Sequence, residues 1–337
     1  MEILSLVAIT IGLTVIFEFV NGFHDSANSI ATVVATKVLS PVKAVAWAAI
    51  FNFAGIYFSQ AVAATIGKGI IDQETIKLEG ALLLFCAVIG AIVWDLITWW
   101  FAIPTSSSHA LVGGLIGAGV AAVGLSAIVW TGTLRTILFI VVSPAAGMIA
   151  AFLITVGVMR LLRRVSKTTV NRWFRHLQLA SSAAYSFGHG SNDAQKGMGI
   201  ITMVLLIESG DTLGTFQVQD WVMIVCGVAI SLGTFFGGWR IVRTMATRIT
   251  KLEPYQGFSA ETGAAAMLFF TAHYGIPVST THTISGGIMG VGATRRLSAV
   301  RWGLGRKIVI AWILTIPAAA TISGALFVLM RALGIHG

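Results

Sequence analysis

Charged residues are scarce in this chain of 337 residues: Asp, Glu, Lys and Arg make up 10% of it, against about 25% in a soluble domain. No long hydrophilic stretch interrupts the sequence, which excludes a sizeable soluble domain. The two cysteines, Cys86 and Cys226, lie in apolar runs, so we expect small core residues rather than a disulfide or a metal pair. A Gly-rich loop ending in Lys-Ser or Lys-Thr is also lacking, so nothing in the sequence supports the use of ATP.

The sequence consists mainly of long apolar runs. Hydrophobic residues make up 56% of the chain, and a helix needs about 20 predominantly apolar residues to cross a bilayer. Runs of roughly this length or longer cover residues 3–20, 42–66, 81–103, 134–162, 221–239 and 308–330. We therefore predict an all-α, multi-pass protein embedded in a lipid bilayer.

The basic residues are concentrated in a few short segments. The net charge of +9 alone would suit a nucleic-acid partner. Clusters of Lys and Arg in short loops between apolar runs are instead typical of the cytoplasmic side of membrane proteins. The three clusters comprise Arg160, Arg163, Arg164, Lys167, Arg172 and Arg175, then Arg240, Arg243, Arg248 and Lys251, and then Arg295, Arg296, Arg301, Arg306 and Lys307. We therefore expect no nucleic-acid partner and place these loops in the cytoplasm.

One stretch of the sequence occurs twice. I-P-T-S-S-S-H-A-L-V-G-G-L-I-G-A-G at residues 103–119 recurs 173 residues later as I-P-V-S-T-T-H-T-I-S-G-G-I-M-G-V-G at residues 276–292. A shared apolar background would not align the Pro, Ser and His of both copies in one register. The aligned residues are Pro104, Ser106 and His109 in the first copy and Pro277, Ser279 and His282 in the second. The sequence therefore predicts a duplicated structural unit.

Charge placement gives the two copies opposite orientations. The first copy is flanked by loops without a strong basic bias, whereas the second has basic loops on both sides. The first unit then opens from outside and the second from inside, which is the inverted-repeat plan of many secondary transporters. We place the first repeat at residues 1–162, a basic cytoplasmic loop at 163–178 and the inverted second repeat at 179–337, with both termini outside. Charge counting leaves open whether each unit crosses the membrane fully or re-enters.

Each copy contains a Pro, then hydroxyl residues, then a Gly-rich apolar run. Pro disfavours helix at the residue before it, and Ser and Thr are favoured N-caps, so we predict a hairpin of helix, break and helix. The start of the second helix offers free N–H groups and a positive dipole end to an anion. The hydroxyl residues concerned are Ser106, Ser107 and Ser108, and Ser279, Thr280 and Thr281. Caps without a ligand are the simpler interpretation, which the duplication disfavours.

Two further stretches place ionisable residues at membrane depth, where they are costly and mark functional sites. N-G-F-H-D-S-A-N covers residues 21–28, and G-H-G-S-N-D-A-Q-K covers residues 188–196. Carboxylate and amide oxygens suit a cation, including a metal ion, and a carboxylate or His can carry a proton. The residues that supply these groups are His24, Asp25, Asn28, Asn192 and Asp193, with Asp25 and Asp193 also predicted as metal ligands.

Alternatives stay open for several residues. Lys196 is either a counter-ion to Asp193, three positions earlier, or a positive charge for an anion. His24 is either a proton carrier or a neutral hydrogen-bonding residue. Weaker candidates within other apolar runs are Glu18, Asp95, Glu261 and His273. A Ser–His nucleophile pair is disfavoured because an enzyme needs one site and neither copy stands out, so we expect no enzymatic activity.

Together these motifs resemble the Pit-type inorganic phosphate transporter family across essentially the whole chain. The family pattern G-x-N-D-x-A-N is similar to residues 22–28 and 190–196, and its P-x-S-x-x-H signature is similar to residues 104–109 and 277–282. The resemblance implies a symporter of inorganic phosphate that works by alternating access. It implies phosphate binding at both hairpins with Lys196, coupling-ion binding at the two Asp motifs, and a supporting role for Pro104, His109, Pro277 and His282.

The departures from the family pattern point to its bacterial low-affinity branch. His24 stands where many members have Asn, and Gln195-Lys196 stands where many have Ala-Asn. That resemblance implies a cytoplasmic-membrane protein driven by H⁺, with phosphate carried as a metal complex such as that of Mg²⁺, and a homodimer. Glu261 resembles a family carboxylate needed for transport and is a further candidate proton carrier. The alternatives are a sodium-coupled phosphate symporter and, in another class, an anion channel.

Overall fold

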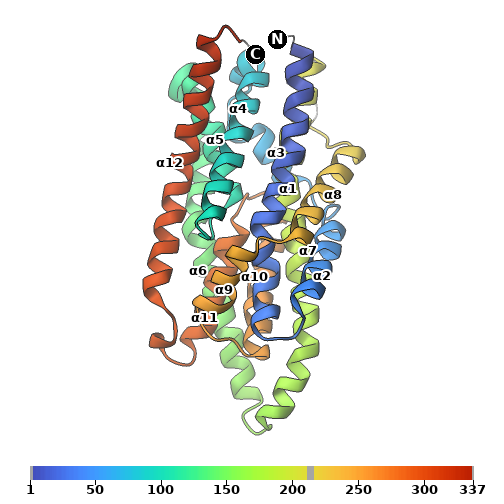
Figure 1. Cartoon of the computed structure of the whole chain (residues 1–337), viewed down its shortest axis with the longest axis vertical. Coiled ribbons are helices and arrows are strands. Elements are labelled where there is room, and N and C mark those ends of the chain that lie inside the picture. Colours follow the sequence, from blue (N-terminus) through green and yellow to red (C-terminus); the bar gives the residue numbers. More distant parts are fainter. Residues whose placement is uncertain (1–2, 211–215, 336–337) are drawn as a thin grey trace.

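The fold is helical throughout the part of the chain that the computed structural model describes, residues 3–210 and 216–335. Two long helices, α1 (Ile3–Ala35) and α7 (Lys167–Glu208), pack against each other and run in opposite directions (Figure 1). The remaining helices are α2 (Pro41–Gly55), α3 (Ala61–Lys68), α4 (Gln73–Trp100), α5 (Ser107–Val123), α6 (Trp130–Leu161), α8 (Asp220–Phe236), α9 (Trp239–Arg248), α10 (Pro254–His273), α11 (Thr280–Ala293) and α12 (Trp302–Ala332). The predicted all-α fold is confirmed.

The same order of elements occurs twice along the chain. A long helix is followed by a helix and a short helix, then by a hairpin, a 3₁₀ turn and a long final helix, first in α1–α6 and then in α7–α12. We call α4–α5 hairpin 1 and α10–α11 hairpin 2. Figure 1 shows hairpin 1 toward the end where both chain termini are marked and hairpin 2 toward the opposite end. Each hairpin therefore enters the bundle from its own end.

Within the described part of the chain, five helices are long and apolar enough to cross a membrane, or six if the bent pair α8–α9 counts as one span. The single crossing predicted at residues 42–66 is wrong, because residues 56–60 separate α2 from α3. Asn52, Ser59 and Gln60 place polar groups in and just after the first of these two helices. The run predicted at 221–239 also ends in a bend, of 66°, where Gly237 adopts a φ of 69°.

The connection between the two sets of elements is shorter than predicted. The basic loop was placed at residues 163–178, but α7 already begins at Lys167, where the Ser166 hydroxyl accepts a hydrogen bond from the N–H of Thr169 and caps the helix. Lys and Arg are good helix formers, so a basic composition did not prevent helix formation. Between α7 and α8, Asp211 lies outside the described residues.

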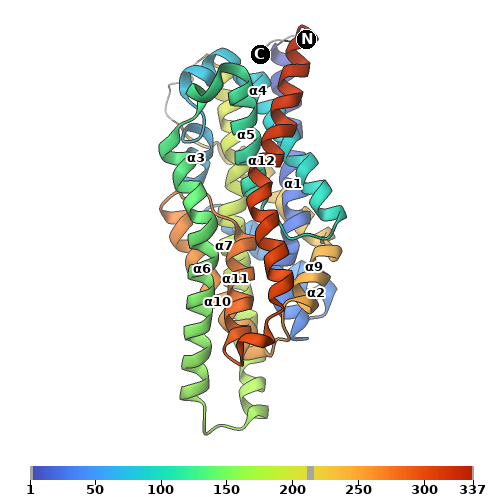
Figure 2. The same ribbon diagram turned by 90° about the vertical axis from the view of Figure 1, so that its left-hand side faces the viewer.

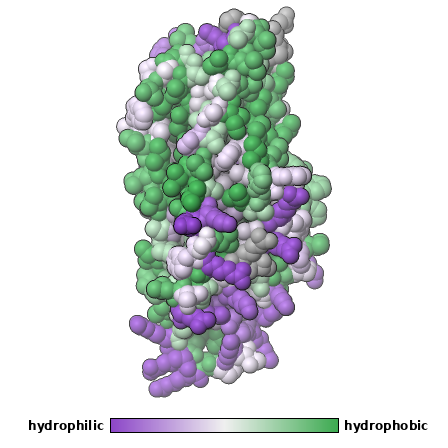
Figure 3. Space-filling model, turned by 60° about the vertical axis from the view of Figure 1, so that its left-hand side comes forward, coloured by the Kyte–Doolittle hydropathy of each residue, from purple (hydrophilic) through white to green (hydrophobic). Residues whose placement is uncertain are grey.

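Helix α7 lies among α1, α2, α3 and α10, and small residues let these helices come close. A Cβ atom on Gly190 would lie 2.0 Å from the carbonyl oxygen of Asn52 on α2, so only Gly allows this approach. Figure 2 shows the lower ends of α6 and α7 extending beyond the rest of the bundle. Figure 3 shows hydrophobic side chains over the half nearer the termini and hydrophilic ones gathered toward the other end, as a membrane span followed by a basic end would require.

Candidate functional site

The tips of the two hairpins are built alike. Helix α5 begins at Ser107, and the hydroxyl of Ser106 accepts a hydrogen bond of 3.2 Å from the N–H of His109. Helix α11 begins at Thr280, and Ser279 accepts an equivalent bond of 3.1 Å from His282. The predicted break and Ser cap are therefore confirmed in both hairpins. The N–H groups of the first two residues of each helix have no intrahelical acceptor, as at any helix start.

The two tips contact each other deep in the bundle. The Ser108 hydroxyl donates a hydrogen bond of 2.8 Å to the carbonyl oxygen of Val278, just before α11. The rings of His109 and His282 meet edge to face, with 4.8 Å between their centroids. Trp312 of α12 stacks on His282 at 3.8 Å and donates a hydrogen bond of 3.1 Å to the carbonyl oxygen of Pro104. These contacts bring the starts of α5 and α11, and hence their dipole ends, to the same region.

Asp25 of α1 and Asp193 of α7 lie on either side of the start of α11. The Thr280 hydroxyl oxygen is 3.2 Å from Asp193 Oδ2 and 3.4 Å from Asp25 Oδ2. The Thr281 hydroxyl is 3.4 Å from Asp25 Oδ1, and Asn28 donates to it at 2.8 Å. Both carboxylates are almost fully buried. Two buried like charges this close require positive charge or a proton between them.

Basic side chains meet both carboxylates. His24 Nδ1 lies 2.8 Å from Asp25 Oδ1. His189 Nε2 lies 3.1 Å from Asp193 Oδ2, and Lys196 Nζ lies 3.1 Å from Asp193 Oδ1. Lys196 is therefore positioned as a counter-ion to Asp193. A bound anion could contact the same ammonium group. Polar contacts continue toward hairpin 1, because His24 Nε2 lies 3.1 Å from the hydroxyl of Thr98.

The sequence reasoning did not single out His189, which is central to this site. Its ring and the carboxylates of Asp25 and Asp193 bring ligand atoms within 4.8 Å of one another, an arrangement that could hold a metal ion. Two carboxylates and an imidazole are suitable ligands for several divalent ions. His189 stands four residues before Asp193, so both side chains lie on one face of α7. That spacing was the available signal.

Several predicted residues lie outside this carboxylate pair. Glu261 accepts hydrogen bonds from the Thr32 hydroxyl (2.6 Å), from the Gln178 amide (3.1 Å) and from the Ser181 hydroxyl, so it belongs to a separate buried cluster. Asn192 donates to the carbonyl oxygen of Leu268 on α10 at 3.0 Å. Of the weaker candidates, Glu18 is buried and accepts a bond of 2.6 Å from the N–H of Gly197, Asp95 is buried, and His273 is exposed.

The short helices α3 and α9 each contact the hairpin of the other set of elements. The Thr65 hydroxyl of α3 donates to the carbonyl oxygen of Gly275 at 2.7 Å. The Thr244 hydroxyl of α9 donates to the carbonyl oxygen of Ala102 at 3.2 Å. Arg240 of α9 also lies over the rings of Trp99 and Trp100, which end α4. It donates a hydrogen bond of 2.9 Å to the carbonyl oxygen of Trp100. These contacts hold both tips against the site.

The chain is similar to phosphate transporters both in sequence and in fold. Residues 21–323 match the model of the phosphate transporter family. The chain is 55% identical, over 93% of each chain, to a probable low-affinity inorganic phosphate transporter of Rhizobium meliloti. It is 39% identical to a protein of the same description in Bacillus subtilis, over 98% of this chain and 99% of the relative. A solved structure described as "The sodium-dependent phosphate transporter" superposes with a TM-score of 0.87 at 27% identity, covering 97% of this chain and 99% of the other.

Proposed function

We propose, for a chain that belongs to the phosphate transporter family, that it imports inorganic phosphate across the cytoplasmic membrane as a proton-coupled symporter. The family consists of transporters and not of enzymes, and the helices that can span a membrane agree with that role. The proposal concerns the coupling ion, the form of the phosphate and the residues that hold each.

Phosphate would bind at the starts of α5 and α11. Free N–H groups and the positive ends of two helix dipoles attract an anion there. The hydroxyls of Ser107 and Ser108, and of Thr280 and Thr281, are buried at these helix starts. Lys196 adds a positive charge from α7. Ser106 and Ser279 would position the helices, because their hydroxyls already cap them.

The observation that carries the proposal is the position of Thr280. It is the first residue of α11, where an anion would bind, and its hydroxyl lies within 3.4 Å of both Asp25 and Asp193, where a cation would bind. An anion and a cation in adjoining sites stabilise each other by direct electrostatic attraction. Binding of one would therefore favour binding of the other, which is the basis of symport.

Two imidazoles next to the carboxylates favour protons as the driving ion. His24 pairs with Asp25 and His189 pairs with Asp193, and His is the side chain best suited to change charge near neutral pH. Glu261 of α10, which accepts hydrogen bonds from α1 and α7, would be a further proton carrier. A Mg²⁺ ion that travels with phosphate would find carboxylate oxygens at Asp25 and Asp193, which are the ligands it prefers.

Alternating access would follow from the two oppositely directed sets of elements. If they are inverted repeats, exchanging their conformations opens the same central site first to one side and then to the other. Both hairpin tips end at the site, so either hairpin could open or close its own side. We also propose that the basic end of the molecule faces the cytoplasm, by the positive-inside rule, and that both termini lie outside.

A sodium-coupled symporter is the second candidate. The hydroxyl oxygens of Thr280 and Thr281 each lie 3.4 Å from an oxygen of Asp25, and hard cations prefer hydroxyl and carboxylate oxygens as ligands. The amide NH₂ group of Asn28 donates to both hydroxyls and would hold them in place. The solved structure of 27% identity is itself described as sodium-dependent. An anion channel would use the same helix dipoles but would need no carboxylate pair.

Uptake of labelled phosphate into proteoliposomes tests these functions. An inward proton gradient or an inward sodium gradient is imposed, each with and without Mg²⁺. We expect uptake to follow the proton gradient and to increase with Mg²⁺. Uptake driven only by sodium would overturn proton coupling and assign the oxygen ligands to Na⁺. Phosphate flux that ignores both gradients would overturn the symporter in favour of a channel.

A further inference from the structure

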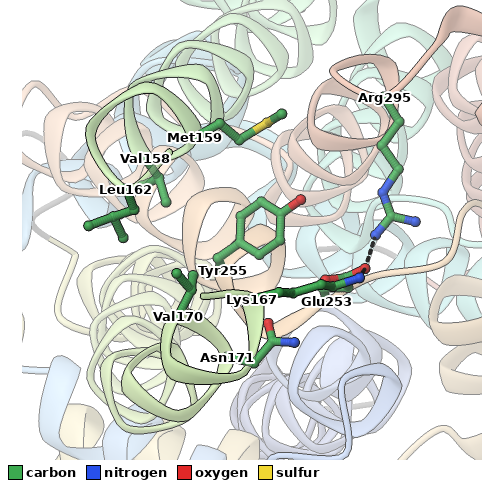
Figure 4. Close-up of a pocket in the computed structure, with 9 residues that line it drawn as sticks. All are labelled: Val158, Met159, Leu162, Lys167, Val170, Asn171, Glu253, Tyr255 and Arg295. Carbon is green, nitrogen blue, oxygen red and sulfur yellow. Dashed lines mark hydrogen bonds and ion pairs between the residues drawn. The ribbon is translucent and has the colours of Figure 1, made fainter. Parts of the chain in front are cut away.

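A pocket lies away from the carboxylate pair, where α6, α7 and the base of hairpin 2 meet (Figure 4). Its volume is about 460 Å³. One wall is apolar and is formed by Val158, Met159 and Leu162 at the end of α6 and by Val170 of α7. The other side is polar. Figure 4 shows the Tyr255 ring between the two sides.

The polar side carries a net positive charge. Lys167 Nζ and Arg295 Nη2 lie 2.9 Å and 2.8 Å from the same oxygen of Glu253, so two cations meet one carboxylate. Each cation also lines a neighbouring hollow. Lys167 does so together with Arg172 and Arg175, and Arg295 together with Lys251, Arg296 and Arg301. An anion in this pocket would therefore have basic side chains around it on both sides, from the two neighbouring hollows.

One acceptor in this pocket lacks a donor. Asn171 Oδ1 is buried and has no hydrogen-bond partner among the described residues. A buried acceptor without a partner is costly. A ligand for this pocket is therefore expected to bring hydroxyl donors as well as negative charge.

The apolar wall continues along the outer face of α6. Phe152, Leu153 and Met159 are 38%, 61% and 46% exposed on a helix that can span the membrane. Acyl chains could follow this face away from the pocket. Inorganic phosphate or a nucleotide would leave the apolar wall unused. The phosphate and hydroxyl groups of a lipid would match the polar side of the pocket, and its acyl chains would match the apolar wall.

We propose that this pocket binds an anionic phospholipid with a hydroxyl-bearing headgroup, such as phosphatidylglycerol. The phosphate would lie near Lys167 and Arg295, the headgroup hydroxyls near Asn171, and the acyl chains along α6. Glu253 caps α10, and Arg295 follows α11, so the bound lipid would join the base of hairpin 2 to the connection between α6 and α7. The proposal does not depend on which ion drives transport.

Thermal unfolding of the purified full-length protein in a neutral detergent tests the site. Phosphatidylglycerol, phosphatidylcholine or inorganic phosphate is added at equal concentration. We expect phosphatidylglycerol to raise Tm by about 5 °C at saturation. Arg295→Gln should remove most of that rise. Arg306→Gln removes the same charge from an exposed position outside the pocket, so it should keep the rise.

Arg295→Gln also breaks an ion pair, so a second variant separates binding from folding. Asn171→Glu leaves the Glu253 pairs in place and adds a negative charge to the pocket, which should abolish the lipid-dependent rise. Retention of the full rise in both variants would overturn the site. An equal rise with phosphatidylcholine would mean general lipid solvation. If inorganic phosphate raises Tm equally, and Arg295→Gln removes that rise, the pocket is a site for a free anion instead.

Discussion

The two hairpin tips are held in the same way but meet different chemistry. In each, a Thr hydroxyl from the opposite set of elements bonds to the carbonyl oxygen of a residue in the left-handed conformation: Thr65 to Gly275 and Thr244 to Ala102. The φ angles of the two accepting residues are 62° and 56°. These contacts are structural and occur in both halves, so they belong to the duplicated scaffold.

The charged groups, by contrast, differ between the halves. Among the described residues, Asp193 has two basic partners, His189 and Lys196, whereas His24 is the one basic partner of Asp25. Glu261 stands 16 residues before Pro277 and has three hydrogen-bond donors, but Val88 stands 16 residues before Pro104. The repeated order of elements therefore describes how the two hairpin tips are built and not which ions they meet. If the protein works by the proposed alternating access, the energies of its two states need not be equal, because one half carries more charge.

Removing the Asp193 charge should have the largest effect. Asp193→Asn leaves Lys196 buried without its carboxylate, at a cost of about 3–5 kcal/mol. Asp25→Asn leaves only His24, which can become neutral. We expect both variants to lose phosphate uptake by at least about 100-fold, because each removes a cation ligand, and Asp193→Asn to show the lower Tm. Proteoliposome uptake and thermal unfolding measure the two effects.

A double variant separates the two effects. Asp193→Asn with Lys196→Met removes the unpaired ammonium group, so it should recover thermal stability without recovering uptake. Full uptake by Asp193→Asn would remove this residue from the mechanism. Equal Tm values for the two single variants would show that the halves do not differ as the contacts indicate.

Glu261→Gln should have the next largest effect. The side-chain amide would turn its NH₂ group toward at least one of the donors from Thr32, Gln178 and Ser181, all of which now bond to a carboxylate. The loss of charged hydrogen bonds in a buried cluster costs about 2 kcal/mol. A lower Tm and slower uptake are expected, whereas Val88→Ile in the other half should change uptake little. Normal uptake by Glu261→Gln would exclude this residue as a proton carrier.

The smallest effects should appear at the left-handed residues. Gly275→Ala forces a Cβ into the left-handed region, at about 1–2 kcal/mol, and places it 2.8 Å from the carbonyl oxygen of Ala61. Ala102→Gly does the reverse and should stabilise the protein by about 0.5 kcal/mol, since Gly adopts this conformation freely. Opposite Tm shifts would confirm that the two tips are equivalent. Shifts of the same sign would contradict it.

The sequence was sufficient where a local pattern determines the structure. The Pro and hydroxyl residues of each repeat predicted the helix breaks and hydroxyl N-caps, and the structure identifies the capping residues as Ser106 and Ser279. The duplicated motifs also pointed to Asp25 and Asp193, which the fold brings together around Thr280. Each of these conclusions required only residues close in sequence or repeated at a fixed offset.

Contacts between distant segments could not be predicted in this way. The donors to Glu261 come from α1 and α7, and nothing in the sequence around residue 261 indicates them. The break between α2 and α3 lies inside an apolar run, where composition alone favours one continuous span. His189 was within reach because it lies four residues before Asp193, but its role depends on Asp25 from another helix.

The contacts made by α3 and α9 also bear on how the protein is made. Ala102 and Thr244 are 142 residues apart, and Thr65 and Gly275 are 210 apart. At a synthesis rate of about 5–20 residues per second, the first hairpin emerges roughly 7–30 seconds before the residue that holds its tip. Throughout that interval α11 has not been synthesised, so Asp25 lacks its contacts with Thr280 and Thr281. The first half of the nascent chain therefore lacks these contacts until the second half has been synthesised. During that time it is exposed to membrane quality control.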